Sequence, residues 1–115
     1  MGKSQLRELA VEFAVNSIKF CKTIKGHYGI VDQLERASTS IGANIHEANY
    51  AHSRADFISK MRIALKECYE TEYWLELMVK SELADRECVR ELYEQCGKIR
   101  RMLIASVKTA RDHQN

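Results

Sequence analysis

The sequence predicts an all-α protein folded as an antiparallel up-down-up-down four-helix bundle. Apolar residues recur every three or four positions in four long segments, which is the period of one face of a helix. The chain has no proline and five glycines, so long uninterrupted helices form easily. Short connections between the segments favour antiparallel neighbours. With a length of 115 residues, the chain is expected to form one domain over residues 1–115.

The first helix is expected to run from about Ser4 to Lys25. Its inward face consists of residues at helical spacing: Leu6, Leu9, Phe13, Ser17, Phe20 and Ile24. Gly26 and Gly29 follow in the segment KGHYG. Because glycine adopts a left-handed backbone conformation at little cost, both are expected to shape the turn that ends this helix.

The second helix is expected from about Ile30 to Ala51, and it carries two adjacent stripes. The apolar stripe is Ile30, Leu34, Ala37, Ile41, Ile45 and Ala48. The polar stripe beside it is Gln33, Arg36, Ser40, Asn44 and Glu47. A helix that only fills a core needs the first stripe alone, so the second predicts an ordered contact with neighbouring helices or subunits. We group six residues as a predicted structural polar seam: Gln33, Arg36, Asn44, Glu47, Glu70 and Glu72.

Capping residues predict where the third and fourth helices begin. Ser53 with Asp56 three residues later forms a capping box, and Asp85 is expected as the next N-cap. The third helix should extend to about Lys80. Its inward residues are Phe57, Met61, Ala64, Cys68, Thr71, Leu75 and Met78. Those of the fourth helix are Val89, Leu92, Cys96, Ile99, Leu103 and Ala110.

Glu72 falls on the core face of the third helix. A buried carboxylate must be paired or protonated, because burying a free charge costs too much free energy. Arg36 or Asn44 of the second helix is the expected partner. Structural pairing is favoured here over a catalytic role.

The first and third helices carry a second apolar face behind the core stripe. Its residues are Val11, Val15, Ile18, Ile63, Tyr73, Trp74 and Leu77. Large apolar patches on a surface indicate an interface. Because these two helices lie on a diagonal of the bundle, their patches face different directions, which suits a head-to-tail ring of subunits. The alternative is a thicker core with slightly rotated helices.

No constellation of residues points to catalysis, a metal or a cofactor. The four cysteines contain no CxxC pair, which indicates reduced thiols in a cytosolic setting. His46 and His52 are six residues apart and do not converge on one helix face. We therefore predict no catalytic, cofactor-binding or metal site, and no enzyme. Without a signal-peptide run or an apolar membrane span, the protein is expected in the cytoplasm and away from membranes.

The charge of the chain is unevenly distributed, although its net value is only +2. Residues 67–94 carry nine acids and three bases, for a net charge of −6, whereas residues 95–115 carry a net +4. In an antiparallel bundle this gathers cations at one end. We call this end the basic pole and predict that it binds nucleic acid: Lys3, Arg7, Arg54, Lys60, Arg62, Arg101, Lys108 and Arg111, with His46 and His52 nearby.

The opposite end forms an acidic pole. It holds Glu76, Glu82, Asp85, Glu87 and Glu91, which are partly offset by Lys19, Lys22 and Lys25. A basic pole of this kind is an electrostatic footprint for phosphate backbones. The alternative interpretation is a solvated charged surface with no partner.

Two segments carry a family resemblance: QLERASTSIGANIHEA (33–48) and DFISKMRIALKECYETEYWLELM (56–78). They resemble the four helix bundle protein family, also called the ribosomal RNA intervening-sequence protein family, with the approximate pattern QLRRA..SI..NIAEG and then F...L.IA..S..E.E..L. The matching positions are Gln33, Leu34, Arg36, Ala37, Ser40, Ile41, Asn44, Ile45, Glu47, Phe57, Ile63, Ala64, Glu70, Glu72 and Leu75. The chain departs from the pattern at His46, where alanine is usual, and at Ala48, where glycine is usual.

This resemblance implies a homopentameric ring of four-helix bundles with no known enzymatic activity. A relative of the same fold, the accessory variability determinant of diversity-generating retroelements, works with a reverse transcriptase and has a basic surface associated with nucleic acid. The leading hypothesis is therefore a non-enzymatic homo-oligomer that binds RNA or DNA through its basic pole, with a reverse transcriptase or another ribonucleoprotein as a candidate partner. The alternative is a structural or protein-interaction scaffold without a nucleic-acid role.

Overall fold

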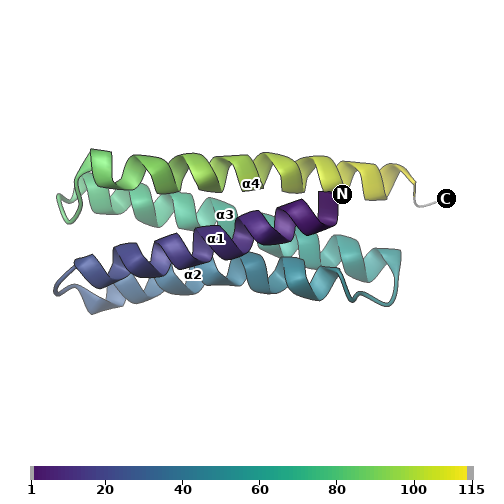
Figure 1. Cartoon of the computed structure of the whole chain (residues 1–115), viewed down its shortest axis with the longest axis horizontal. Coiled ribbons are helices and arrows are strands. Elements are labelled where there is room, and N and C mark those ends of the chain that lie inside the picture. The colour runs from purple at the N-terminus through teal and green to yellow at the C-terminus, as the bar shows by residue number, and fades with distance from the viewer. Residues whose placement is uncertain (1, 114–115) are drawn as a thin grey trace.

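The computed structural model describes the backbone of residues 2–113 and the side chains of residues 5–113. It contains four α-helices, α1 (Gly2–Thr23), α2 (Tyr28–Ala48), α3 (Arg54–Lys80) and α4 (Arg86–Asp112), and no strand within the described residues. The helices alternate in direction along a rod with extents of 49 × 20 × 20 Å (Figure 1). The predicted all-α fold class is confirmed.

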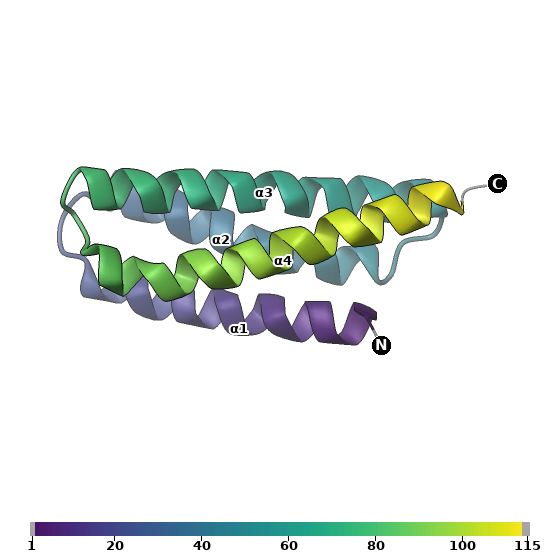
Figure 2. The same ribbon diagram turned by 90° about the horizontal axis from the view of Figure 1, so that it is seen from above.

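Each helix packs against two others. α1 and α3 both contact α2 and α4, whereas the pairs α1–α3 and α2–α4 face each other across the bundle. Figure 2 shows α4 running obliquely, beside α1 near its start and toward α3 near its end. A 3.3 Å hydrogen bond from Asn16 to Gln95 joins α1 to α4. A 2.8 Å hydrogen bond from Arg54 to the carbonyl of His113 joins α3 to the end of α4. The divergence of α1 and α4 opens a cleft of about 920 Å³ at the end that carries both termini.

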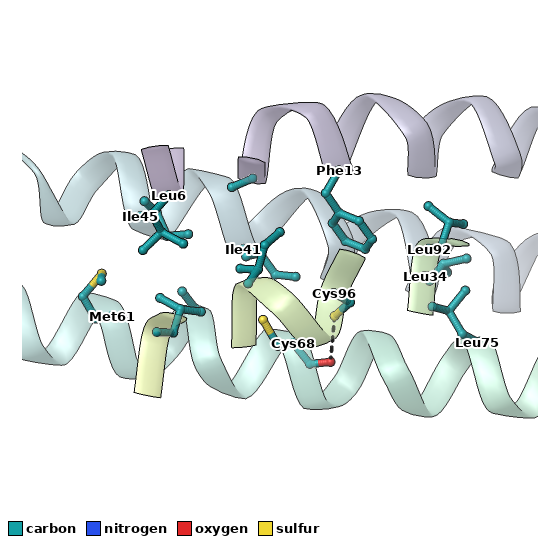
Figure 3. Packing of buried hydrophobic residues seen from close by; sticks show 14 of the residues in the cluster. Leu6, Phe13, Leu34, Ile41, Ile45, Met61, Cys68, Leu75, Leu92 and Cys96 are labelled. Carbon is teal, nitrogen blue, oxygen red and sulfur yellow. Dashed lines mark hydrogen bonds between the residues drawn. The ribbon is translucent and has the colours of Figure 1, made fainter. Parts of the chain in front are cut away.

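The core is one continuous stripe from each helix, and Figure 3 shows part of it. Most of the predicted inward residues are buried. Leu9, Phe20, Ile24, Ile30, Phe57 and Ala110 only flank the core and are partly buried, while Ala10, Cys21, Val31, Ile58 and Val107 are buried without having been predicted. This difference corresponds to a small rotation of each helix about its axis. The core also contains hydrogen bonds, among them a 2.6 Å bond that the Ser17 hydroxyl donates to the Ser38 hydroxyl.

The first turn differs from the expectation. Gly26 is left-handed (φ 78°), as predicted, but Gly29 lies within α2, which begins at Tyr28. His27 takes the second left-handed position instead (φ 51°). Histidine is one of the residues found there more often than most non-glycine types. The prediction for Gly29 was therefore wrong.

Local hydrogen bonds account for the remaining helix ends. The Ser53 hydroxyl accepts a 3.0 Å bond from the Asp56 amide, which confirms the cap of α3. Asp85 occupies the N-cap position of α4, but its side chain makes no capping bond. At the end of α3, Glu82 is left-handed (φ 64°), and the amide of Leu83 donates to the carbonyl of Met78 at 2.9 Å. This is the Schellman pattern, with glutamate where glycine is usual.

The cysteines are free thiols with different environments. Cys21, Cys68 and Cys96 are buried, and Cys88 is exposed. The Cys96 thiol donates to the carbonyl of Cys68 at 3.5 Å (Figure 3). Burial is the main cause that raises the pKa of Cys21 to about 11, and the contact with Cys68 together with burial raises that of Cys96. Thiolates are the reactive species, so these buried thiols should be inert.

We expect a thiol-specific reagent at neutral pH to modify Cys88 rapidly and the other three cysteines only after unfolding. The measurement is a time course of modification with and without denaturant. Cys88→Ser should remove the fast phase. A fast phase that survives this substitution would contradict the buried positions of the other thiols.

Candidate nucleic-acid interface

The basic pole lies at one end of the rod. The start of α1, the connection from α2 to α3, and the end of α4 meet there (Figures 1 and 2). The side chain of Lys3 lies outside the described residues. The other seven predicted cations belong to the start of α1, the first turns of α3 and the second half of α4, and their contacts divide them into two groups.

Four of these cations have partners within the protein. The Arg7 guanidinium donates to Nδ1 of His46 at 3.2 Å. Lys60 and Arg111 form ion pairs with Glu47 (2.9 Å) and Asp112 (3.6 Å). Arg54 donates to the carbonyls of Ala110 and His113, where it satisfies acceptors at the end of α4. These contacts tie the helix ends together and leave less charge free for a ligand.

Three of the predicted cations have no acidic partner among the described residues: Arg62, Arg101 and Lys108. All three are exposed. Arg62 also lines a hollow of about 470 Å³ with Lys66 and Arg111, over the apolar side chains of Ile58 and Ile63. Lys66 was missed by the sequence analysis, although it follows Arg62 by one helical turn. The face shared by α3 and α4 is therefore the least neutralised part of the basic pole.

Of the five carboxylates predicted at the acidic pole, only Glu76 and Glu87 form ion pairs with described residues. Lys80 pairs with Glu76 at 2.9 Å, and Arg90 lies between Glu87 (3.3 Å) and Glu94 (3.7 Å). Three lysines of the α1 end are exposed and make no ion pair with a described residue: Lys19, Lys22 and Lys25. They provide a matched control for charge reversal at the other pole.

The polar stripe of α2 runs along α3. Arg36 contacts Glu70 and lies 3.6 Å from Glu67, while Glu47 pairs with Lys60. Asn44, in contrast, donates to the Ser40 carbonyl of its own helix at 2.9 Å. Gln33 is exposed and makes no side-chain hydrogen bond with a described residue. The register set by the two ion pairs places Gln33 about level with Trp74 on the neighbouring helix.

Glu70 accepts hydrogen bonds from side chains of both α2 and α3 at this contact. Partial burial by itself raises its pKa, but hydrogen bonds from Arg36 and from the Trp74 indole (3.2 Å) outweigh that effect, so the pKa of Glu70 lies below its ordinary value. The neighbouring Glu67 has one buried oxygen without a hydrogen-bond partner in the described structure. The seam therefore holds an ionised Glu70 through donors from both α2 and α3.

The partner of Glu72 is on α4. Its Oε2 accepts a 2.9 Å hydrogen bond from Nε of Arg100, and the Glu72 side chain is 12% exposed. The expected pairing with Arg36 or Asn44 was therefore wrong. Glu72 sits at the edge of the core stripe that faces α4, whereas Arg36 and Asn44 belong to the helix on the other side of α3. Arg100 was not among the predicted residues.

The predicted oligomer interface is not uniformly exposed. Val11, Val15, Ile63 and Tyr73 are exposed, whereas Ile18 and Leu77 are partly covered. Trp74 was expected nearly opposite the core, but it is partly buried and packs against the core cluster. Its indole stays on the α2 side of α3 through the bond to Glu70. Of the predicted interface residues on α3, Ile63 and Tyr73 are thus exposed, whereas Trp74 is not.

Within the described residues, no three histidine, cysteine, aspartate or glutamate side chains gather where a metal ion would need them. No helix in that part of the chain is long and apolar enough to cross a membrane. Glu70 and Glu72 of α3 are each already paired with an arginine of a neighbouring helix, Arg36 of α2 and Arg100 of α4.

A family model described as 23S rRNA-intervening sequence protein matches residues 3–105. The chain belongs to this family. The resemblance in the two segments of α2 and α3 therefore identified the family correctly. Membership brings no assigned residue roles with it, so the contacts described above remain the basis for any functional conclusion.

A solved relative has the same fold along nearly its whole length. It is a protein of unknown function from the S23 ribosomal protein family of Bacteroides thetaiotaomicron, solved at 1.70 Å resolution. The two chains are 40% identical, with a TM-score of 0.88, over 94% of this chain and 99% of the relative. No protein of curated description matches the chain.

We expect Arg36→Met to lower the free energy of unfolding at neutral pH and to have little effect in acid. The pKa of Glu70 is depressed in the folded state, so its ionised form contributes stability above its unfolded pKa, and this contribution is lost as the pH falls through the folded pKa. Urea unfolding from neutral pH down to about pH 3 would measure the difference.

Arg101→Met is the matched control, since Arg101 has no acidic partner among the described residues. Its effect should not depend on the ionisation of Glu70. A destabilisation by Arg36→Met that stays constant across the pH range would show that packing of the arginine stem, and not its charge, is what α2 contributes here.

Proposed function

We propose that this member of the family is a non-enzymatic, cytoplasmic homo-oligomer that binds RNA or DNA through its basic pole. The observation that carries the proposal is the set of cations without acidic partners on the α3–α4 face: Arg62, Lys66, Arg101 and Lys108. A cation that is already paired gains little from a phosphate, because it must first give up its carboxylate. An unpaired exposed cation needs only to exchange counterions.

The distribution of charge along the rod supports the same proposal. Most carboxylates of α3 and α4 lie toward the opposite end, so they do not repel a polyanion at the basic pole. The hydrogen bonds of Arg54 to carbonyls at the end of α4 and the ion pair of Lys60 with Glu47 hold the helix ends in place near the free cations. The pole therefore combines a fixed frame with unneutralised charge, which is typical of phosphate-binding surfaces.

The family description adds context for the ligand. Its name refers to sequences that intervene in 23S ribosomal RNA. On that basis a structured RNA, or a ribonucleoprotein such as a reverse transcriptase complex, is the partner that we propose for the basic pole. The likeness to the accessory variability determinant of diversity-generating retroelements motivates the reverse transcriptase as a partner.

The oligomeric part of the proposal rests on exposed apolar side chains. Val11 and Val15 on α1 and Ile63 and Tyr73 on α3 lie on helices that face each other across the bundle, so the two patches point away from each other. A patch on one subunit that meets the other patch on the next subunit generates a ring, and a pentamer is the ring that the family resemblance favours.

The alternative function is a scaffold that binds only protein. It is favoured by the same apolar patches and by the paired state of Arg7, Arg54, Lys60 and Arg111. Under this alternative the free cations serve only to keep the surface hydrated.

Reversal of three free cations separates the two functions. We expect the triple variant Arg62→Glu, Arg101→Glu and Lys108→Glu to bind RNA at least about tenfold more weakly and to flatten the salt dependence of binding by about one unit of slope per lost phosphate contact. The measurement is fluorescence anisotropy of a labelled structured RNA between about 50 and about 200 mM salt.

Lys19→Glu, Lys22→Glu and Lys25→Glu produce the same change of net charge at the other pole and should bind almost as the unaltered protein does. Equal losses in both triple variants would indicate a nonspecific effect of net charge. Binding of the unaltered protein that does not weaken with salt would exclude phosphate contacts and favour the scaffold.

We expect Ile63→Glu with Tyr73→Glu to dissociate the oligomer while the helical content remains unchanged, because both side chains are exposed in the single subunit. Light scattering would give the mass and circular dichroism the helicity. Tyr28→Glu, at an exposed site on α2, is the control. An unaltered protein that is monomeric at about micromolar concentration would end the ring proposal.

A further inference from the structure

A tyrosine lies beside the free cations of the α3–α4 face and takes no part in the core. Tyr69 of α3 is 52% exposed. The guanidinium carbon of Arg100 on α4 lies 5.8 Å from the centre of its ring, within the range of a cation–π contact. Arg100 is itself fixed, since its Nε donates to Glu72. The ring is thus held from one direction while about half of the side chain stays open to solvent.

Two interactions hold this aromatic group in place. Glu72 is largely buried, and burying its charge without a partner would cost free energy. The Glu72–Arg100 pair is therefore held at the edge of the core. The cation–π contact then extends this anchored pair to the surface. An exposed tyrosine on a helix ordinarily moves among rotamers, but Tyr69 has a neighbour that favours one position. A preorganised ring loses less entropy when it binds a ligand.

The cations lie on the same side of α3. Counting from Tyr69 toward the start of the helix, Lys66 and Arg62 follow at spacings of three and four, so the three side chains lie along one face. Arg111 of α4 reaches the hollow lined by Arg62 and Lys66. At a rise of about 1.5 Å per residue, the line from Arg62 to Tyr69 is about 10 Å long. A row of cations that ends at an open aromatic ring is therefore built into this face.

We propose that the α3–α4 face binds a single-stranded segment of nucleic acid, with its phosphates on Arg62 and Lys66 and one unpaired base stacked on Tyr69. This inference rests on the proposed function and specifies its ligand. Base–aromatic stacking together with a positively charged track is how proteins hold single strands without reading their sequence.

A duplex does not fit these features. Its bases are already stacked on one another, so their faces are closed to an aromatic side chain. Recognition of a duplex through its grooves needs an element that protrudes into them. The α3–α4 face is the side of a rod about 20 Å wide, with Tyr69 in the middle of a long helix and not at a tip. Single-stranded loops and ends of a structured RNA expose the base faces that Tyr69 would meet.

The experiment compares Tyr69→Ala with the unaltered protein, using a fluorescein-labelled oligoadenylate of about 12 nucleotides, made as RNA and as DNA. We expect Tyr69→Ala to weaken binding to the single strand about tenfold and Tyr69→Phe to retain it, because the phenyl ring still stacks. Binding to the duplex of the same strand with its complement should be weak and unaffected by either substitution. Tyr28→Ala, at an exposed tyrosine near the other pole, is the control.

A third probe removes the stacking partner and leaves the phosphates. On an abasic strand of the same length, Tyr69→Ala and the unaltered protein should bind equally. If Tyr69→Ala binds the oligoadenylate as tightly as Tyr28→Ala does, while reversal of Arg62, Arg101 and Lys108 still abolishes binding, the stacking site is wrong and the proposed function stands. If the unaltered protein binds none of the probes in a salt-dependent manner, the proposed function fails together with the site.

Discussion

The burial of one apolar stripe from each of four antiparallel helices is the constraint on which the other features depend. In a rod about 20 Å wide there is room for a single core between the helices, and side chains such as Phe13, Leu34 and Leu75 fill it. Each helix therefore has one rotation about its axis that buries its stripe. Once that rotation is set, every polar residue beside the stripe has a fixed neighbouring helix. The surface contacts follow from the core.

The sequence predicted much of this because helical periodicity directly reports which face is buried. Residues such as Leu34, Ile41 and Cys68 lie at the centre of a stripe, where a rotation of a few tens of degrees does not change their burial. For residues at the edge of a stripe, periodicity does not say which neighbouring helix they contact. Glu72 and Trp74 lie on opposite edges of the α3 stripe, two residues and about 200° apart, so each has a different neighbour. Which neighbour each one meets depends on the direction in which the helices pack around the core.

The errors at the candidate site have this same origin. Glu72 was assigned to α2 because Arg36 offered a matching charge, but the edge on which Glu72 lies faces α4 and Arg100. Trp74 was placed nearly opposite the core by its angular position on the helix and was therefore assigned to an interface, but the edge on which it lies faces α2 and Glu70. Charge and size alone could not separate these cases. The end-to-end distribution of charge was easier to predict, since it requires only helix direction and not helix rotation.

The ion pairs of α3 determine which positive charges on its surface remain unpaired. Its two edges each carry a carboxylate that is paired with an arginine from a neighbouring helix, Glu70 with Arg36 and Glu72 with Arg100. Those arginines are used to neutralise the edges of the core, so neither adds free positive charge for a ligand. Arg62 and Lys66 lie on the outer face of α3 between the two edges, where no carboxylate of the described residues pairs with them. The outer face of α3 near the basic pole therefore keeps its positive charge, because no carboxylate of the described residues neutralises Arg62 or Lys66. The contact of Arg100 with Tyr69 then links a packing interaction to that charged face.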